Sequence, residues 1–238
     1  MLSEDFTAVS ASRDSEELFV AVLQFCRRLE FDTMTAMAVL DHPDRETEFR
    51  CVDNAPPGYL DMANDPAEGR RDPVMQHCRF SSLPIVWNQD TYVAANCADK
   101  WEGQARHGYR TGVALALHLP QGQHLFVGFD RDQALPRDAS RITRIVADMQ
   151  LFAVLACEAA FRVLFPERSD SQDFKALTGR ELECLRWTME GKTAWEVGKI
   201  LSISQQTAVR HVNNATHKLG CINKHQAVLK ALRLGLIR

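Results

Sequence analysis

The decisive stretch of the chain reads TAWEVGKILSISQQTAVRHVNNATHKLG, residues 193–220. Thr193 stands three residues before Glu196, which is the spacing of a capping box at the start of a helix. After a short turn Ser204 offers a second N-cap, and Gly220 follows the last apolar residue of the second helix. Two short helices joined by such a turn predict a helix-turn-helix.

Further helices are predicted on both sides of this stretch. Thr178 and Glu181 form another capping box, and Gly191 marks the end of the helix that they begin. Asn223 can cap a last helix. The sequence therefore predicts a C-terminal helix-turn-helix domain of four helices over residues 176–238.

In a helix-turn-helix, the second helix lies in the major groove and presents its first residues to base edges. The apolar pattern predicts a buried side made of Ile200, Ile203, Ala208, Val212, Ala215 and Leu219. The positions left for double-stranded DNA are Gln205, Gln206, Thr207, Val209, Arg210, Asn213 and Asn214. Gln and Asn can bond adenine with two hydrogen bonds, and Arg can bond guanine. Phosphate contacts set affinity rather than sequence, and the lysines that suit them are Lys192, Lys199, Lys218 and Lys224.

The C-terminal part of the chain and the remainder carry net charges of opposite sign. Residues 175–238 hold 11 Lys and Arg against 4 Asp and Glu, a net charge of +7. The whole chain has 28 basic and 31 acidic residues, so the remainder holds 17 and 27 and carries −10. A basic end on an acidic body is typical of proteins that meet phosphates at one end only.

The preceding residues 1–165 have the pattern of a mixed helical and sheet domain. Apolar residues recur at helical spacing behind an N-cap at Asp14 or Ser15, and again over 140–165. Strands are expected at residues 33–40, 48–52, 112–119 and 124–130. This order predicts an α+β fold, with an antiparallel sheet sandwiched by helices, and a cavity between sheet and helices is the natural place for a small ligand. The polar residues 166–175 are expected to form the linker.

Composition excludes several other classes. The seven cysteines are spread without a Cys-x-x-Cys pair, so neither a disulfide framework nor a zinc site is indicated. No run of about 18 apolar residues predicts a membrane span, and residues 1–17 lack the apolar core of a signal peptide. Catalytic motifs such as Gly-x-Ser-x-Gly, a P-loop or His-Glu-x-x-His do not occur. We therefore expect a cytoplasmic protein with no catalytic residues, no metal and no bound cofactor.

The C-terminal motifs resemble the DNA-binding domain of the LuxR family. The resemblance covers about 60 residues and rests on Leu177-Thr178-x-Arg180-Glu181, Trp187, Gly191-Lys192-Thr193, Glu196-x-x-x-Ile200-Leu201, Ser204-x-x-Thr207, His211 and Lys218-Leu219. The chain departs from it after Thr207, where Ala208 and Val209 stand in place of the family's usual Val and Lys or Arg.

Landmarks over residues 15–165 are similar to those of the autoinducer-binding domain of quorum-sensing regulators. They are Asn54-Ala55-Pro56, Asp72-Pro73, Pro84-Ile85-Val86-Trp87, Trp101-Glu102 and Gly108-x-x-x-Gly112. The resemblance implies a site for a small hydrophobic signal such as an N-acyl-homoserine lactone. It assigns Asp72 as the acceptor of the ligand's amide N–H, and Trp87 and Trp101 as aromatic walls. Asp72 followed by Pro73 is also a common way to start a helix, so a purely structural capping role is the alternative.

Three polar positions of that pattern are changed. Tyr59 replaces the usual tryptophan, and Ala63 and Ala55 replace tyrosines. Gly128 stands where a Ser or Thr is often found, and Thr35 on the first strand could supply another hydroxyl. Losing donors while gaining volume predicts an altered head group, a bulkier ligand or relaxed selectivity.

The sequence thus predicts a signal-responsive transcription regulator that binds a palindromic operator as a homodimer. The first alternative is a LuxR-type regulator that answers a non-lactone metabolite or a partner protein. The second alternative, an enzyme with a DNA-binding tail, is disfavoured by the missing catalytic motifs.

Overall fold

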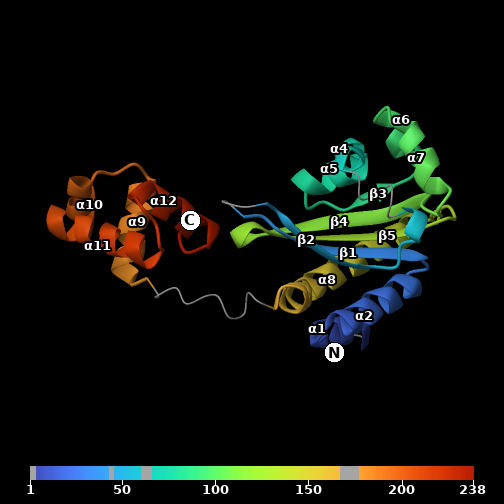
Figure 1. The fold of residues 1–238 in the computed structure, drawn as a ribbon, viewed down its shortest axis with the longest axis horizontal. Helices are drawn as coiled ribbons and strands as arrows, with labels where there is room; N and C mark the ends of the chain where they lie inside the picture. The colour runs from blue at the N-terminus through green and yellow to red at the C-terminus, as the bar shows by residue number, and fades with distance from the viewer. Residues whose placement is uncertain (1–3, 43–45, 60–65, 167–176) are drawn as a thin grey trace. The chain divides into compact units, whose positions relative to one another are not determined.

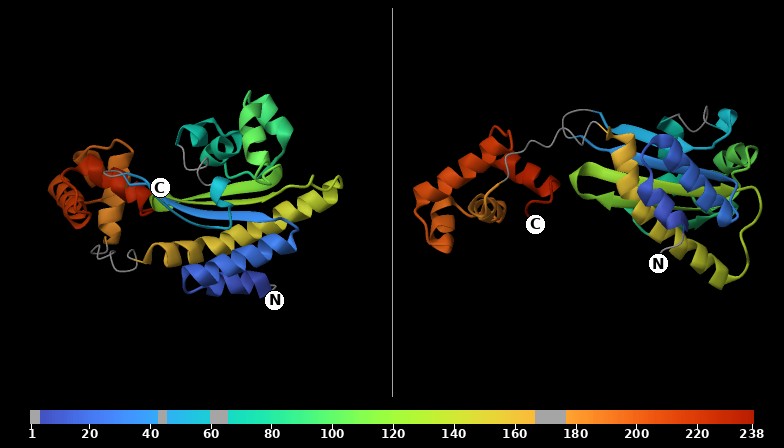
Figure 2. Two further views of the ribbon diagram at one scale, coloured as in Figure 1. Left: turned by 45° about the vertical axis from the view of Figure 1, so that its right-hand side comes forward. Right: turned by 90° about the horizontal axis from the view of Figure 1, so that it is seen from below.

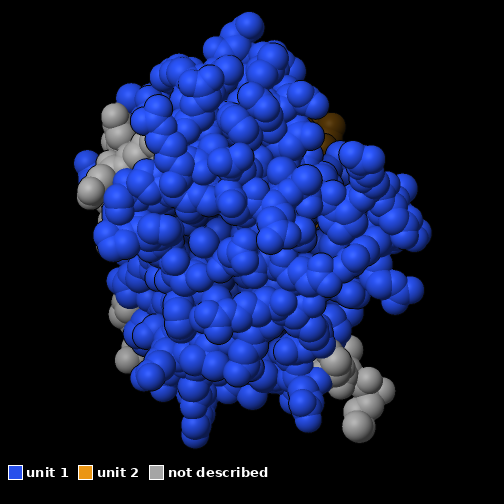
Figure 3. Space-filling model, turned by 90° about the vertical axis from the view of Figure 1, so that its right-hand side faces the viewer, with its two compact units in different colours: residues 1–119, 123–169 blue, residues 120–122, 170–238 orange. Residues whose placement is uncertain are grey.

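A computed structural model describes residues 4–42, 46–59, 66–166 and 177–238. The chain divides into two compact units, one formed by residues 1–119 and 123–169 and the other by 120–122 and 170–238 (Figure 3). The predicted linker 166–175 lies outside the described residues except for Pro166. Within the described part of the chain, no helix is long and apolar enough to cross a membrane.

The first unit is built on a five-stranded sheet in the order β2-β1-β5-β4-β3, with every neighbouring pair antiparallel. The strands are β1 (Thr33–Leu40), β2 (Glu48–Asp53), β3 (Ile85–Trp87), β4 (Thr111–Leu119) and β5 (Gln123–Arg131). The four predicted strands are present, and the short β3 is an addition. A 3-10 turn, η1 (Pro120–Gly122), joins β4 to β5, as the turn residues predicted.

Helices cover both faces of this sheet (Figures 1 and 2). One layer holds α1 (Glu4–Ala11), α2 (Ser15–Arg28) and α8 (Ala139–Leu164). The other layer holds α4 (Pro66–Arg71), α5 (Pro73–Phe80), α6 (Gln89–Ala94) and α7 (Ala98–Ala105). The predicted α+β fold, a helix-sheet-helix sandwich, is therefore confirmed.

The main core lies between the sheet and the layer of α1, α2 and α8. Alternate residues of β1, beginning with Met34, point into it because side chains of a strand alternate between its faces. The rings of Phe25 and Phe152 stack at 3.9 Å between centroids and join α2 to α8. Asp14 is the N-cap of α2, since its side chain accepts a hydrogen bond from the backbone N–H of Glu17.

The second unit contains α9 (Gly179–Met189), α10 (Ala194–Leu201), α11 (Gln205–Lys218) and α12 (Lys224–Arg233) among its described residues. Thr178, Thr193, Ser204 and Asn223 are their N-caps, as predicted, and the first two form complete capping boxes. Gly198 allows the turn after α10 to lie against the backbone of that helix. A Cβ at this position would stand 2.9 Å from the carbonyl oxygen of Ile203.

The buried side of the helix-turn-helix follows the prediction with one correction. Ala208, Val212, Ala215 and Leu219 are buried, and Ile203 is partly buried. Ile200 is instead 44% exposed. The buried stripe of α10 runs along Val197, Gly198 and Leu201, and at 3.6 residues per turn Ile200 stands roughly 100° away from its centre.

A carboxylate ties α9 to α11. Glu181 is 3% exposed, and its Oε2 accepts hydrogen bonds from the backbone N–H of Thr178 at 2.7 Å and from Nζ of Lys218 at 2.8 Å. Burial by itself raises the pKa of the Glu181 carboxyl, but the hydrogen bonds from Lys218 and Thr178 outweigh it, and the pKa is lowered overall. The ion pair therefore stabilises the packing of the unit at neutral pH.

We expect Lys218→Ala to lower the free energy of unfolding by about 2 kcal/mol, because it leaves the Glu181 carboxylate buried without its cation. Calorimetry of the full chain measures this loss in the transition of the second unit. Since the folded-state pKa of Glu181 is lowered, its contribution is present above the unfolded pKa of about 4.3 and disappears as the pH falls through the folded value. The difference in free energy of unfolding between wild type and Lys218→Ala should therefore shrink as the pH falls.

Arg180→Ala is the matched control, because Arg180 forms an exposed pair with Glu183 three residues along the same helix. Such a pair contributes less than about 0.5 kcal/mol. Equal losses in the two variants would contradict the structural role of Lys218.

Candidate ligand site and DNA-binding helix

The sheet face beneath α5, α6 and α7 combines small residues with buried polar ones. Strand register places Trp87, Gly112, Asp130 and Thr33 in one row across β3, β4, β5 and β1. A Cβ at Gly112 would stand 2.5 Å from Oδ1 of Asp130 and 2.6 Å from Nε1 of Trp87. Only glycine therefore lets the indole and the carboxyl approach each other over β4.

The next rows of the same face hold small residues and one large ring, that of Phe126, which packs over Gly128. Ala114 pairs with Gly128, Gly128 pairs with Thr35, and Ala116 pairs with Phe126. A second hydrophobic cluster covers these rows, built from buried Val74, Cys78, Trp87, Tyr92, Cys97 and Tyr109, with Tyr59 and Trp101 packed against it. Small residues on the sheet and large aromatic ones above it are what a site for a slender apolar ligand requires.

Asp72 is the N-cap of α5, as the structural alternative for this residue predicts. Its Oδ1 accepts hydrogen bonds from the backbone N–H groups of Val74 at 2.9 Å and Met75 at 3.1 Å. The side chain is nevertheless buried above the sheet, at 8% residue exposure. Because Oδ1 serves the helix, Oδ2 keeps acceptor capacity for the cluster around it.

Two donors lie at the edge of bonding distance from the free side of this carboxylate. The hydroxyl of Tyr92 on α6 stands 3.4 Å from both oxygens, and Nζ of Lys100 on α7 stands 3.7 Å from Oδ2. Lys100 also pairs with Glu68 of α4 at 3.4 Å. Lys100 thus balances the charge of the buried Asp72 without saturating it.

Tyr59 and Tyr109 form the aromatic part of the cluster. Their rings stack with centroids 3.8 Å apart and planes 8° apart. Burial raises the pKa of both phenols, so both hydroxyls are donors at neutral pH. The hydroxyl of Tyr109 is fully buried, and it lies near the side chain of Thr33 without forming a hydrogen bond of good geometry with any residue that the structure describes. An unmet buried hydroxyl costs free energy and marks a place where a ligand atom can bind.

Trp101, Thr35 and Ala63 are the other residues predicted for the ligand site. Nε1 of Trp101 donates to the carbonyl oxygen of Arg110 at 3.0 Å, so its indole N–H is already used and its ring packs at the edge of the cluster. Thr35 is half-buried on β1 beside Gly128. Ala63 lies outside the described residues.

Sequence reasoning missed three polar members of the cluster, namely Tyr92, Tyr109 and Asp130. Asp130 could have been found from strand periodicity, because it follows Gly128 by two residues and shares its face. Tyr92 and Tyr109 lie in segments whose pattern carries no such signal. No group of His, Cys, Asp and Glu able to hold a metal ion occurs among the described residues.

The second unit presents the predicted DNA-facing residues on α11. Gln205, Gln206, Val209, Arg210, Asn213 and Asn214 are exposed. Thr207 is half-buried, and its backbone N–H is bonded to the Oγ of Ser204 at 3.0 Å, which fits a capping role. The exposed residues form one polar face, opposite the buried side of the helix.

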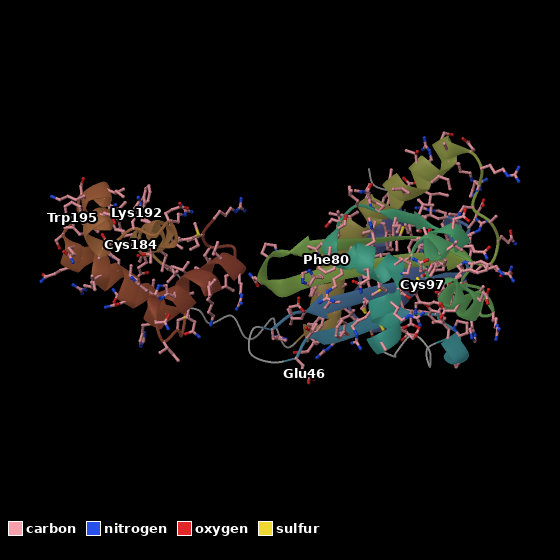
Figure 4. All side chains as sticks on the ribbon, turned by 90° about the horizontal axis from the view of Figure 1, so that it is seen from above. Glu46, Phe80, Cys97, Cys184, Lys192 and Trp195 are labelled. Atoms are coloured by element: carbon pink, nitrogen blue, oxygen red, sulfur yellow. The ribbon has the colours of Figure 1, made fainter. Side chains whose placement is uncertain are left out.

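The lysines divide into two kinds. Lys192, just before α10, is exposed and extends from the surface near Trp195 (Figure 4). Lys199 is exposed too, with its Nζ 5.7 Å from the centre of the Trp195 ring. Lys218 differs, since its pairing with Glu181 gives it a structural role within the unit. The phosphate contact of Lys218 stays a prediction beside this structural role.

Comparison with known proteins identifies the family of each domain. The family described as "Autoinducer binding domain" matches residues 14–160, and the family described as "Bacterial regulatory proteins, luxR family" matches residues 175–231. Transcriptional activator protein SolR of Ralstonia nicotianae is 31% identical over 98% of this chain and 97% of its own length. Regulatory protein SdiA of Escherichia coli is 30% identical over 94% of this chain and 91% of its own length.

Solved structures of SdiA share the fold of the whole chain. A crystal structure of Escherichia coli SdiA matches with a TM-score of 0.71 and 28% identity, over 98% of this chain and 95% of the other. SdiA in complex with octanoyl-rac-glycerol matches with a TM-score of 0.68 and 27% identity, over 98% and 93%. These relatives are regulators of transcription rather than enzymes. The chain belongs to the LuxR family of bacterial transcriptional regulators, with an autoinducer-binding domain followed by a LuxR-type DNA-binding domain.

Proposed function

We propose that the protein binds a small acyl signal between its sheet and helices α5–α7, and controls promoters as a homodimer according to whether that signal is bound. The observation that carries the proposal is the buried polar cluster above the small-residue face of the sheet. Asp72 keeps acceptor capacity there, and the Tyr109 hydroxyl, near Thr33, forms no hydrogen bond of good geometry with a described residue. A ligand with a polar head group and an apolar chain satisfies both features.

The head group must donate a hydrogen bond to Asp72. The amide N–H of an N-acyl-homoserine lactone does so, and so does the hydroxyl of an acylated alcohol. The solved complex of SdiA with octanoyl-rac-glycerol shows that this relative accommodates an acyl chain on a head group that is not a lactone. Tyr59, which replaces the usual tryptophan, favours the same second candidate for this chain, namely a non-lactone acyl ligand.

Mass spectrometry of small molecules extracted from the purified protein tests the proposal. We expect an acyl compound in stoichiometric amount, and we expect operator affinity to change when that compound is removed and restored. Purified protein that carries no small molecule and responds to neither a lactone nor an acylglycerol would refute control by an acyl signal. A DNA regulator of this kind would act in the cytoplasm, where bacterial promoters lie.

We expect Asp72→Asn to weaken binding of N-octanoyl-homoserine lactone by ten-fold or more. Losing a charge-assisted hydrogen bond costs about 1.5–3 kcal/mol, and each 1.4 kcal/mol is about ten-fold in affinity. Tyr59→Phe removes a neutral hydrogen bond of about 1 kcal/mol and should weaken binding less. Titration of the lactone into each purified full-length variant measures both affinities, either by calorimetry or by displacement of a fluorescent ligand.

Asp72→Ala separates the two roles of this residue. Asparagine caps a helix about as well as aspartate, whereas alanine costs about 1 kcal/mol. Asp72→Asn should therefore keep the thermal stability of the free protein, and Asp72→Ala should not. If Asp72→Asn binds the lactone like wild type, Asp72 is a helix cap only.

The DNA-binding proposal rests on the exposed polar face of α11. One recognition helix reads few base pairs, so we propose that two chains bind a palindrome whose half-sites stand about 10 bp apart. Gln206 and Arg210 would contact base edges, and Lys192 and Lys199 would contact phosphates.

We expect Arg210→Ala and Gln206→Ala to reduce affinity for the operator by about 1–3 kcal/mol each, with little change on random DNA. Gel-shift titration on both DNAs measures the preference, and sedimentation of the complex should give two chains per operator. Arg180→Ala removes a similar charge away from α11 and should leave the preference unchanged. Equal losses on operator and random DNA for Arg210→Ala would refute base recognition by that residue.

A further inference from the structure

Asp130 is a buried carboxyl group in the middle of the candidate ligand site. The residue is 8% exposed and lies on the sheet face that α5–α7 cover. It forms no ion pair with any residue in the described part of the chain. The adjacent Arg131 is directed elsewhere, because its guanidinium donates to the carbonyl oxygens of Glu30, Gln133 and Ala134.

The two oxygens of Asp130 lie in different surroundings. Oδ1 lies over Gly112, where the indole of Trp87 also lies, and the Trp87 side chain donates a hydrogen bond to the Asp130 carboxyl. Oδ2 is the carboxyl oxygen nearer to Gly128, 3.9 Å from the position of a Cβ there. The ring of Phe126 packs over Gly128, 3.1 Å from the same Cβ position, so Oδ2 lies beside an apolar ring.

The surroundings of Asp130 favour the protonated form of its carboxyl group. Burial and the nearby charge of Asp72 raise the pKa of the Asp130 carboxyl well above its usual range, and the hydrogen bond from Trp87 opposes this only in part. The other titratable groups around it are the phenols of Tyr59, Tyr92 and Tyr109 and the thiol of Cys26, which burial keeps neutral. Lys100 of α7 is directed at Asp72 and Glu68 instead. Of two buried carboxyls that repel each other, the one that lacks a cation keeps its proton more readily, and here that one is Asp130.

We propose that the Asp130 carboxyl donates its O–H to an acceptor oxygen of the bound signal, while Asp72 accepts from a donor on the same head group. The inference rests on the proposed signal site and adds its chemistry. The site selects molecules whose head group offers both a donor and a carbonyl or hydroxyl oxygen. Asp130 thereby supplies a donor in addition to the hydroxyl of Tyr59.

Asparagine and leucine at position 130 distinguish a donor from a charged acceptor. Asp130→Asn keeps an oxygen for Trp87 and offers an N–H₂ donor to the ligand, whereas Asp130→Leu offers neither. We use N-octanoyl-homoserine lactone and 1-octanoyl-rac-glycerol as probes on the full chain at pH 6 to 8. Asp130→Asn should bind the better probe within about two-fold of wild type, and Asp130→Leu should bind it about ten-fold more weakly or worse.

The control is Asp132→Asn, because Asp132 is an exposed residue just beyond the same strand that pairs with Arg110. It should leave binding unchanged. If Asp130→Asn loses as much affinity as Asp130→Leu, the carboxyl acts as an ion and the inference is wrong. If Asp130→Leu binds like wild type, Asp130 does not contact the signal and the inference is equally wrong.

A measurement without ligand checks the protonation itself. Because the folded-state pKa is raised, the folded protein holds a proton that the unfolded chain releases above about pH 4, and wild-type stability falls as the pH rises toward the folded value. Asp130→Asn removes this dependence. Its melting temperature should exceed that of wild type at pH 8, and the difference should shrink toward pH 4; a difference independent of pH overturns the inference even if Asp130→Leu does not fold.

Failure of the underlying function gives a different result. Wild-type protein that binds neither probe and carries no extractable ligand would refute the proposed signal site, and the role of Asp130 with it. Wild-type binding combined with losses in Asp130→Asn refutes the role of Asp130 alone.

Discussion

The two oxygens of the Asp72 carboxylate have different partners, and together they connect helices α5, α6 and α7 above the sheet. One oxygen binds the first backbone N–H groups of α5 and so fixes where that helix begins. The other is held above the sheet, within reach of Tyr92 and Lys100 from two further helices. Because one side chain starts α5 and faces the polar cluster, the cluster cannot be rearranged without moving the helix layer that encloses it.

Glu181 performs a comparable task in the DNA-binding unit. A single oxygen accepts from the N-terminal backbone of α9 and from Lys218 at the end of α11. The exposed face of α11 is therefore positioned by a bond at its far end, distant from the residues proposed to read bases. A buried acceptor that serves several donors gives each unit a rigid point, although the two carboxylates arise from unrelated folds.

The helices of the second unit could be predicted from neighbouring residues in the sequence. Contacts between distant segments could not be predicted in this way. Thr178, Thr193, Ser204 and Asn223 cap the helices where the sequence placed them, because capping depends on residues within one turn. The ion pair of Lys218 was not foreseen because its partner Glu181 lies 37 residues away. Strand periodicity places Asp130 on the face of Gly128, but its contacts depend on the register of β3, β4 and β5, which the sequence does not show.

The close contact between Gly198 and the turn before α11 affects how the DNA preference of such a regulator can change during evolution. The turn that leads into α11 touches the backbone of α10 where no side chain intervenes. The angle between the two helices is thus set by main-chain contact, and exchanges among apolar side chains alter it little. Residues on the exposed face of α11 are free to vary while the helix keeps its approach to DNA. New operator preferences can accumulate one substitution at a time, provided that position 198 stays glycine.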